Sequence, residues 1–256
     1  MKKSIFAGCL AVVAGLVMAT TAGAVFVDGV VLNTRVFNDI PDSVVTTAAN
    51  FPALVEIGDA FPNGGSGVNR HDALLSNDGG LTAKLFAIGD PFDVRANVTL
   101  TDGSDTPRKE AGIRLNSPIT GDVLFIINSD AGEIVAFGGG APFHIFGKND
   151  TGNGYSPGDT ILMGMIYRPG APGTLEYVID RGSGLESSGP LPFANLEGGP
   201  VNFRVGLYGQ GGPNAAGDFF NTRFADISAR VPEPSSILLV VLAAVGGLGM
   251  VNRRAR

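Results

Sequence analysis

Residues 92–100 alternate apolar and polar side chains without interruption. A period of two sends successive side chains to opposite faces, as in a β-strand with one buried face. The apolar face would carry Phe92, Val94, Ala96, Val98 and Leu100. This pattern predicts a half-buried strand, and residues 101–105 supply the Asp and Gly typical of a turn after it.

Further strands are expected where apolar, β-branched and aromatic residues recur between turns rich in Gly and Pro. These segments are 110–115, 122–128, 133–137, 143–146, 160–167, 174–180, 203–207 and 219–229, with weaker signals at 25–32, 53–57 and 81–88. Residues 181–200 predict a long surface loop, and no segment has the periodicity of an amphipathic helix. We therefore expect an all-β, two-sheet antiparallel sandwich of roughly ten to thirteen strands.

Three of these segments resemble concanavalin-A-like jelly-roll sandwiches: EAGIRL at 110–115, VNFRVGLY at 201–208 and FNTRFADI at 220–227. The resemblance implies a jelly-roll-like order of strands. A fold of this kind does not by itself imply a function.

The first 24 residues have the three parts of a secretory signal peptide. Lys2 and Lys3 precede an apolar stretch over residues 5–18, and Ala22 and Ala24 provide the small residues that a signal peptidase accepts. Cleavage is expected after Ala24. A first membrane helix and a lipoprotein signal at Cys9 are the alternatives. Cys9 is the only cysteine, so cleavage would leave a mature chain without a disulfide.

The C-terminus also has three parts: a polar motif at 231–236, an apolar segment at 237–251 and a basic end at 252–256. The motif contains Val231, Pro232, Glu233, Pro234 and Ser235, and the basic end contains Arg253, Arg254 and Arg256. The uncharged run from residue 235 to 251 would be about 25 Å long as a helix, enough for one transmembrane span. Its arginines would stay cytoplasmic under the positive-inside rule.

This arrangement resembles the PEP-CTERM sorting signal of Gram-negative bacteria. The resemblance implies an exosortase-type membrane protease or transpeptidase as partner, a precursor anchored in the inner membrane, and delivery to the cell surface or extracellular matrix. The expected organisation is a signal peptide (1–24), a β-sandwich domain (25–230) and a sorting signal (231–256).

The predicted mature chain loses five of the 18 basic residues and none of the 24 acidic ones, so its net charge becomes −11 instead of −6. Such a body repels nucleic acid, which we therefore exclude as a partner.

No strand carries the closely spaced carboxylates of a sandwich glycosidase. Glu176 and Asp180 share a strand face but would be about 13 Å apart, too far for a catalytic pair. Arg70, His71 and Asp72 contain two members of a hydrolytic triad, yet no serine lies in a Gly-x-Ser-x-Gly turn. No catalytic residue is therefore predicted.

Two oxygen-rich loops could bind Ca²⁺, one through Asp102 and Asp105 and the other through Asp150 and Asn153. The same residue types are common in ordinary turns, so plain loops are the alternative. Tyr155 is the candidate for stacking on a sugar ring.

Together these features predict a non-catalytic, exported structural or adhesive protein that binds glycan, such as exopolysaccharide, or calcium weakly. The alternative is a polysaccharide-active enzyme, a glycoside hydrolase or lyase, whose site residues are dispersed in the sequence.

Overall fold

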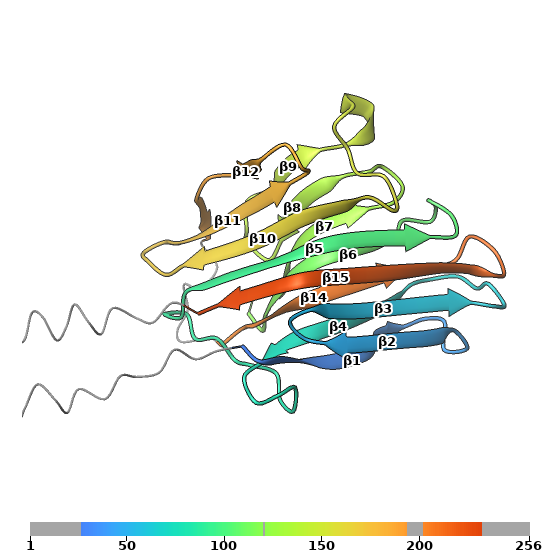
Figure 1. Ribbon diagram of the computed structural model, residues 1–256, viewed down its shortest axis with the longest axis horizontal. Coiled ribbons are helices and arrows are strands. Elements are labelled where there is room, and N and C mark those ends of the chain that lie inside the picture. The colour runs from blue at the N-terminus through green and yellow to red at the C-terminus, as the bar shows by residue number, and fades with distance from the viewer. Residues whose placement is uncertain (1–26, 120, 194–201, 232–256) are drawn as a thin grey trace, which may run out of the picture. The chain divides into compact units, whose positions relative to one another are not determined.

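A computed structural model describes residues 27–119, 121–193 and 202–231. The predicted signal peptide and nearly all of the predicted sorting signal lie outside these residues. The regular elements of the described part are strands and one 3₁₀ turn, Asn149–Thr151, and the strands form two sheets (Figure 1). None of its helices is long and apolar enough to span a membrane.

One sheet has seven strands. In spatial order they are β1 (Gly29–Asn38), β4 (Asn69–Ser76), β14 (Arg204–Gly211), β6 (Glu110–Ser117), β7 (Gly121–Asn128), β8 (Ile134–Gly138) and β9 (His144–Gly147).

The other sheet has eight strands and lies nearer the viewer in Figure 1. Its order is β12 (Leu185–Ser187), β11 (Gly173–Asp180), β10 (Thr160–Arg168), β5 (Phe92–Asp102), β15 (Asp218–Arg230), β3 (Leu54–Phe61) and β2 (Val44–Asn50), with β13 (Leu191–Phe193) beside β11. Neighbouring strands are antiparallel in both sheets. The predicted all-β, jelly-roll-like sandwich is confirmed.

The alternation in β5 works as the sequence predicts. Its apolar side chains are buried between the two sheets, and the polar side chains that alternate with them along the strand are partly exposed. Phe92 packs there against Phe86, Phe203 and Tyr167, with ring centroids 5.6 to 5.9 Å apart. Burial of side chains of this size contributes about 1.5 to 3 kcal/mol each, so this aromatic cluster stabilises one end of the sandwich.

Four of the described strands were not expected from the sequence: β2, β4 and the short β12 and β13. β2 has a Thr- and Ala-rich sequence and lies exposed at a sheet edge, while β4 is buried along its whole length despite its polar residues. At residues 81–88 a strand was expected, but the structure has only an isolated bridge between Phe86 and Phe203. The predicted loop at 181–200 contains the short strands β12 and β13.

The polar residues of β4 are tolerated in the core because they form a hydrogen-bonded network. Asn69 and His71 each lie within 3.0 Å of Asp59 Oδ2 on β3. The backbone N–H of Arg35 donates to His71 Nδ1 at 2.9 Å, so the proton of the neutral ring is on Nε2, which donates to Asp59. Burial raises the pKa of Asp59, but hydrogen bonds from His71, Ser43 and Asn69 outweigh it and hold that pKa below its usual value.

Candidate active site

A groove of about 450 Å³ lies on the outer face of the seven-stranded sheet, near the start of β6. Its lining residues are Arg108, Glu110, Glu133, Val135, Phe137 and Phe143. Glu110 belongs to β6, and Glu133 immediately precedes β8. The β6–β7 pairing, in which Glu110 lies opposite Asn128, brings these distant segments together.

The guanidinium of Arg108 lies between the two glutamates of the groove. Its Nε is 2.8 Å from Glu110 Oε1, and its Nη2 is 2.9 Å from Glu133 Oε2. Asp130 approaches the same guanidinium at 4.0 Å. One cation therefore holds two carboxylates close together and has a third nearby.

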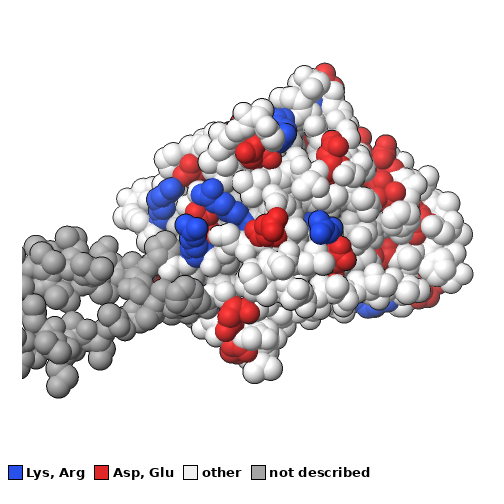
Figure 2. All heavy atoms as spheres, in the orientation of Figure 1, with Lys and Arg blue, Asp and Glu red and all other residues white. Residues whose placement is uncertain are grey.

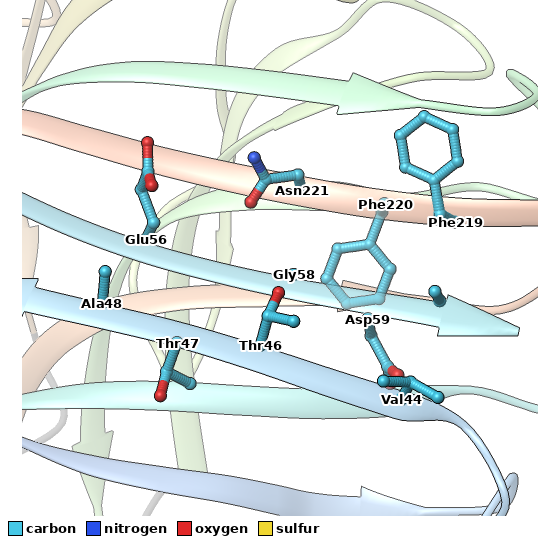
Figure 3. A pocket seen from close by; sticks show the side chains of 11 residues that line it. Val44, Thr46, Thr47, Ala48, Glu56, Gly58, Asp59, Phe219, Phe220 and Asn221 are labelled. Atoms are coloured by element: carbon cyan, nitrogen blue, oxygen red, sulfur yellow. The ribbon is translucent and has the colours of Figure 1, made fainter.

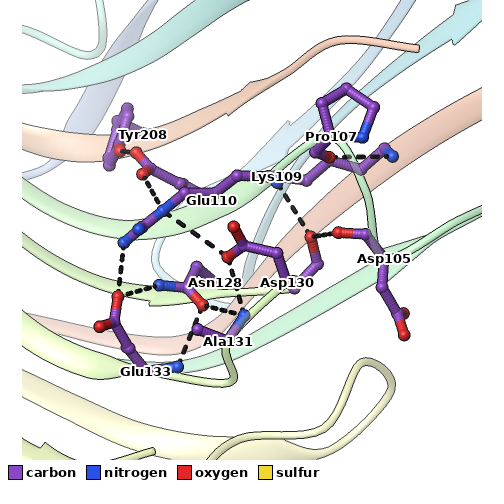
Figure 4. Close-up of polar contacts among 11 residues, drawn as sticks. Asp105, Pro107, Lys109, Glu110, Asn128, Asp130, Ala131, Glu133 and Tyr208 are labelled. Atoms are coloured by element: carbon purple, nitrogen blue, oxygen red, sulfur yellow. Dashed lines mark hydrogen bonds and ion pairs between the residues drawn. The ribbon is translucent and has the colours of Figure 1, made fainter. Parts of the chain in front are cut away.

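Two uncharged side chains fix the orientation of these carboxylates (Figure 4). The buried Tyr208 hydroxyl donates to Glu110 Oε2, and Asn128 Nδ2 donates to Glu133 Oε2 at 2.8 Å. Burial raises the pKa of Tyr208 well above its usual value, and the neighbouring Glu110 raises it further. Tyr208 therefore keeps its proton at neutral pH and acts as a hydrogen-bond donor.

Four charged residues on the same outer face form a second network. Arg114 pairs with Asp72 and Asp122, and Arg70 pairs with the same two carboxylates at 3.4 and 2.9 Å. Burial raises the pKa of Asp72. For Asp122 burial also raises the pKa, but hydrogen bonds from Arg114 and Asn116 outweigh it and lower that pKa. These ion pairs link β4 to β6 and β7.

Another hollow, of about 390 Å³, lies on the outer face of the eight-stranded sheet over β2, β3 and β15 (Figure 3). Its lining includes Thr46, Glu56, Asn221 and Phe219. Glu56 is paired with Arg223 at 3.2 Å, and Asp59 binds His71 in the core. Acidic and basic side chains are interspersed over this face of the molecule (Figure 2). Because Glu56 is bound to Arg223 and Asp59 to His71, the hollow lacks the paired carboxylates of the first groove.

Tyr155 does not present its ring to a ligand. The side chain is 1 % exposed, and its hydroxyl contacts the backbone of Leu100 and Asp159 at 2.8 to 3.0 Å. The stacking role predicted for Tyr155 does not fit this position. The loop that carries Tyr155 has a mostly polar sequence, which gives no sign that this residue anchors the loop in the core.

The four residues predicted for calcium binding are divided between two loops. Asp105 accepts a hydrogen bond from Ser129 through its backbone oxygen, and the Asp102 carboxylate has a buried, unpartnered Oδ2. In the other loop, Asp150 pairs with Lys148, and the Asn153 side chain accepts hydrogen bonds from Thr151 and the Lys148 N–H. Among the described residues, no group of three or more His, Cys, Asp or Glu side chains is arranged to hold a metal.

Arg70, His71 and Asp72 do not form a hydrolytic triad. His71 points into the core toward Asp59, whereas Arg70 and Asp72 belong to the network on the outer face. Glu176 lies on the outer face of β11 and pairs with Arg168 at 2.6 Å. Val231 lies at the end of the described chain, and the remaining residues of the predicted motifs fall outside it.

The residues of the groove could not be recognised from the sequence, because no single strand carries both carboxylates. Glu110 and Glu133 are 23 positions apart in the sequence and meet only through the pairing of β6, β7 and β8. The sequence does contain one clue at residues 108–110, where a predicted strand begins. Arg108 and Glu110 are two positions apart there, so their side chains project from the same face of the strand.

Comparison with known proteins finds similarity at the level of fold. No protein-family model and no curated protein matches the chain. Among solved structures, alginate lyase AlgAT5 of polysaccharide lyase family 7 has a TM-score of 0.46 at 10% identity, covering 81% of this chain and 96% of its own. The alginate lyase from Corynebacterium sp. has a TM-score of 0.47 at 11% identity, covering 72% and 83%. The lectin UEA-II, complexed with galactose, has a TM-score of 0.46 at 11% identity, covering 79% and 93%.

The predicted non-catalytic, structural or adhesive function is corrected. The solved structures of similar fold include lyases as well as a lectin, so this fold does not exclude an enzyme. The physical basis of that prediction also fails, because a carboxylate pair exists across neighbouring segments although no single strand carries one.

Proposed function

We propose that the protein is a polysaccharide-active enzyme whose active site is the groove at the start of β6. The observation that carries this proposal is the position of Glu110 and Glu133 on either side of the Arg108 guanidinium. Glycoside hydrolases typically use two carboxyl groups about 5 to 9.5 Å apart, one as an acid and the other as a nucleophile or base. A pair held by a single guanidinium is close enough for such a division of roles.

The two glutamates would be the catalytic residues, and their neighbours would be positioning residues. Tyr208 orients Glu110, and Asn128 orients Glu133. Because these donors are themselves held by strands β14 and β7, the carboxylates are fixed before a substrate arrives.

The groove also offers a surface for sugar rings. Phe137, Phe143 and Val135 line it beside the carboxylates, and the Phe143 side chain is 67% exposed. Aromatic rings bind the apolar C–H faces of pyranoses by stacking. Phe143, and not the buried Tyr155, would therefore be the stacking residue.

The decisive experiment measures release of reducing ends from a panel of polysaccharides. Glu110→Gln and Glu133→Gln keep the side-chain shape and should each lower kcat about 10²- to 10⁴-fold. Glu176→Gln is the matched control, because Glu176 is ion-paired on the outer face of the other sheet. The control should retain wild-type activity, and thermal unfolding should confirm that all three variants fold. Wild-type rates in either glutamine variant, or no cleavage of any polysaccharide by the wild type, would refute the proposal.

The same proposal includes delivery to the outside of the cell. It is supported by the sequence alone: the signal-like residues 1–24 with Ala22 and Ala24, and the PEP-CTERM-like residues 231–256. An exosortase-type enzyme and a signal peptidase would be the processing partners, with the precursor held in the inner membrane. Mass spectrometry of the protein from its bacterial cells tests this. A chain that begins at Val25 and lacks Arg253, Arg254 and Arg256 is expected, and an intact chain in the cytoplasm would overturn it.

A further inference from the structure

The groove has an excess of negative charge. Arg108 is the one cation among its lining residues, and Glu110, Glu133 and Asp130 all lie within 4.0 Å of its guanidinium. A substrate carboxylate placed beside Arg108 would therefore also face three carboxylates of the protein. Like charges at this range repel, and the repulsion grows when water is displaced.

The other arginines that could neutralise an anionic sugar on this face are unavailable. Arg70 and Arg114 are both paired with Asp72 and Asp122. The Arg70 guanidinium also lies 5.3 and 5.0 Å from the ring centroids of Phe37 and Tyr208, and its side chain is 4% exposed.

Arg204 is the exposed arginine on β14, but it lies opposite Asn116, at the far end of β6 from Glu110. It is therefore several residues along the sheet from the groove. Lys148 is close enough to Glu133 to interact with it electrostatically, but it is paired with Asp150 at 2.5 Å. A polyuronate bound in the groove would therefore have its charges next to acids, with the Arg204 cation out of reach.

The apolar side of the groove suits an uncharged sugar. Phe143 and Phe137 provide aromatic rings, and the partly exposed Ile145 on β9 extends the apolar surface. Stacking on C–H faces needs no charge on the ligand. Asp130 and Glu133 would accept hydrogen bonds from sugar hydroxyls.

Resting on the proposed function, we infer that the substrate is an electrically neutral polysaccharide and that its cleavage is hydrolysis. β-Elimination removes a proton next to a uronate carboxyl group, which a neutral sugar does not have. In hydrolysis one glutamic acid gives its proton to the glycosidic oxygen as the bond from that oxygen to C1 breaks. Water supplies the new oxygen on C1 and returns a proton to the carboxylates. No other reactant is needed.

The test compares soluble polymers that differ in charge but share a backbone. Hydroxyethyl cellulose is the neutral member and carboxymethyl cellulose the anionic one; xylan and galactomannan are added as neutral polymers, alginate and polygalacturonate as anionic ones. We expect reducing ends from at least one neutral polymer, at least tenfold slower cleavage of each anionic one, and no ultraviolet-absorbing unsaturated product.

The outcomes separate this inference from the proposed function. Unsaturated product from alginate or polygalacturonate would overturn the neutral-substrate inference and leave the enzyme proposal standing. If no polymer is cleaved, the enzyme proposal fails, and the inference fails with it.

Binding measurements give a second readout that does not depend on turnover. Asp130→Asn should raise the affinity for alginate severalfold at low salt, because one of the repelling carboxylates is removed. Phe143→Ala should lower the affinity for a neutral polymer at least tenfold. Phe219→Ala, on the outer face of the other sheet, is the control and should bind like the wild type. Unchanged affinities in both groove variants would contradict the inference.

Discussion

Lys109 and Asp218 form a buried ion pair, with Lys109 Nζ 3.1 Å from Asp218 Oδ2. The lysine side chain is 0% exposed, and its ammonium also donates to the backbone oxygen of Ser104 at 2.5 Å. Asp218 accepts further hydrogen bonds from the backbone N–H groups of Asn214 and Phe219. The pair therefore fastens the loop between β5 and β6 to the start of β15, next to the segment that carries Arg108.

Lys109→Met should lower the free energy of unfolding by about 3 to 5 kcal/mol, because it leaves the Asp218 carboxylate buried without its cation. Urea unfolding at neutral pH measures the loss. Lys148→Met is the matched control: its partner Asp150 is exposed, so the change should be below about 1 kcal/mol. Equal losses in the two variants would mean that burial of the Lys109 pair has no special effect.

This pair also bears on the calcium site predicted at Asp102 and Asp105. The Lys109 ammonium already holds the position among Ser104, Pro107 and Asp218 oxygens that a cation in this loop would take. We therefore expect the wild-type thermal midpoint to be the same in calcium and in a chelator. A calcium-dependent rise that disappears in Asp102→Asn would show instead that the loop binds the ion.

Stability should fall as the pH drops from about 4 to about 2. Hydrogen bonds that outweigh burial lower the pKa values of Asp59, Asp122 and Asp218, and those to Ser76 and Thr82 lower the pKa of Asp78 to about 2. A carboxyl group with a lowered folded-state pKa stabilises the protein above its unfolded value, near 4, and loses that contribution as the pH falls through the folded value.

Two variants are expected to change the loss of stability on acidification in opposite directions. The urea concentration at the midpoint of unfolding, measured at neutral and acidic pH, tests this explanation. Asp59→Asn removes a lowered pKa, so it should lose less stability on acidification than the wild type. Asp102→Asn removes a pKa that burial raises, so it should lose more. Identical pH profiles for the two variants would rule out these carboxyl groups as the cause.

Much of the fold could be predicted from the periodicity of single segments. β5, β10 and β11 all lie in segments predicted as strands, and the residues predicted to share the apolar face of β5, such as Val94 and Val98, are buried. β4 could not be recognised this way, because its buried face contains Asn69 and His71. Those residues are stable there only because Asp59, on another strand, completes their hydrogen bonds, and that partner is invisible in a local pattern.

The candidate site was harder to predict for the same physical reason. Its geometry depends on register: Glu110 lies opposite Asn128 across β6 and β7, and Asn128 then holds Glu133. Tyr208 reaches Glu110 from β14, 98 positions away in the sequence. Only the pairing of strands brings these groups together, so residue spacing alone could not reveal the pair of carboxylates.

Tyr208→Phe should lower kcat about 10- to 100-fold with little change in KM, because Glu110 loses the donor that orients it while the sugar-binding surface is kept. Steady-state kinetics on the cleaved polysaccharide measure both constants. Tyr177→Phe is the matched control, since the Tyr177 hydroxyl is buried without a hydrogen-bond partner. A parallel fall of kcat in both variants would indicate general loosening of the core instead of a positioning role.

Tyr155→Phe should destabilise the protein by about 1 to 3 kcal/mol without changing polysaccharide binding. The hydroxyl accepts a hydrogen bond from the Leu100 N–H at 2.8 Å and lies 2.8 Å from the Asp159 carbonyl oxygen, so its loss leaves buried backbone groups unpaired. Burial raises the pKa of Tyr155 to about 12, which keeps the hydroxyl protonated and makes the effect independent of pH up to about 9. Urea unfolding and affinity for the cleaved polymer are measured together, with Tyr177→Phe as control. A loss of affinity with unchanged stability would restore Tyr155 as a sugar-stacking residue; the opposite result would confirm that it anchors its loop to β5.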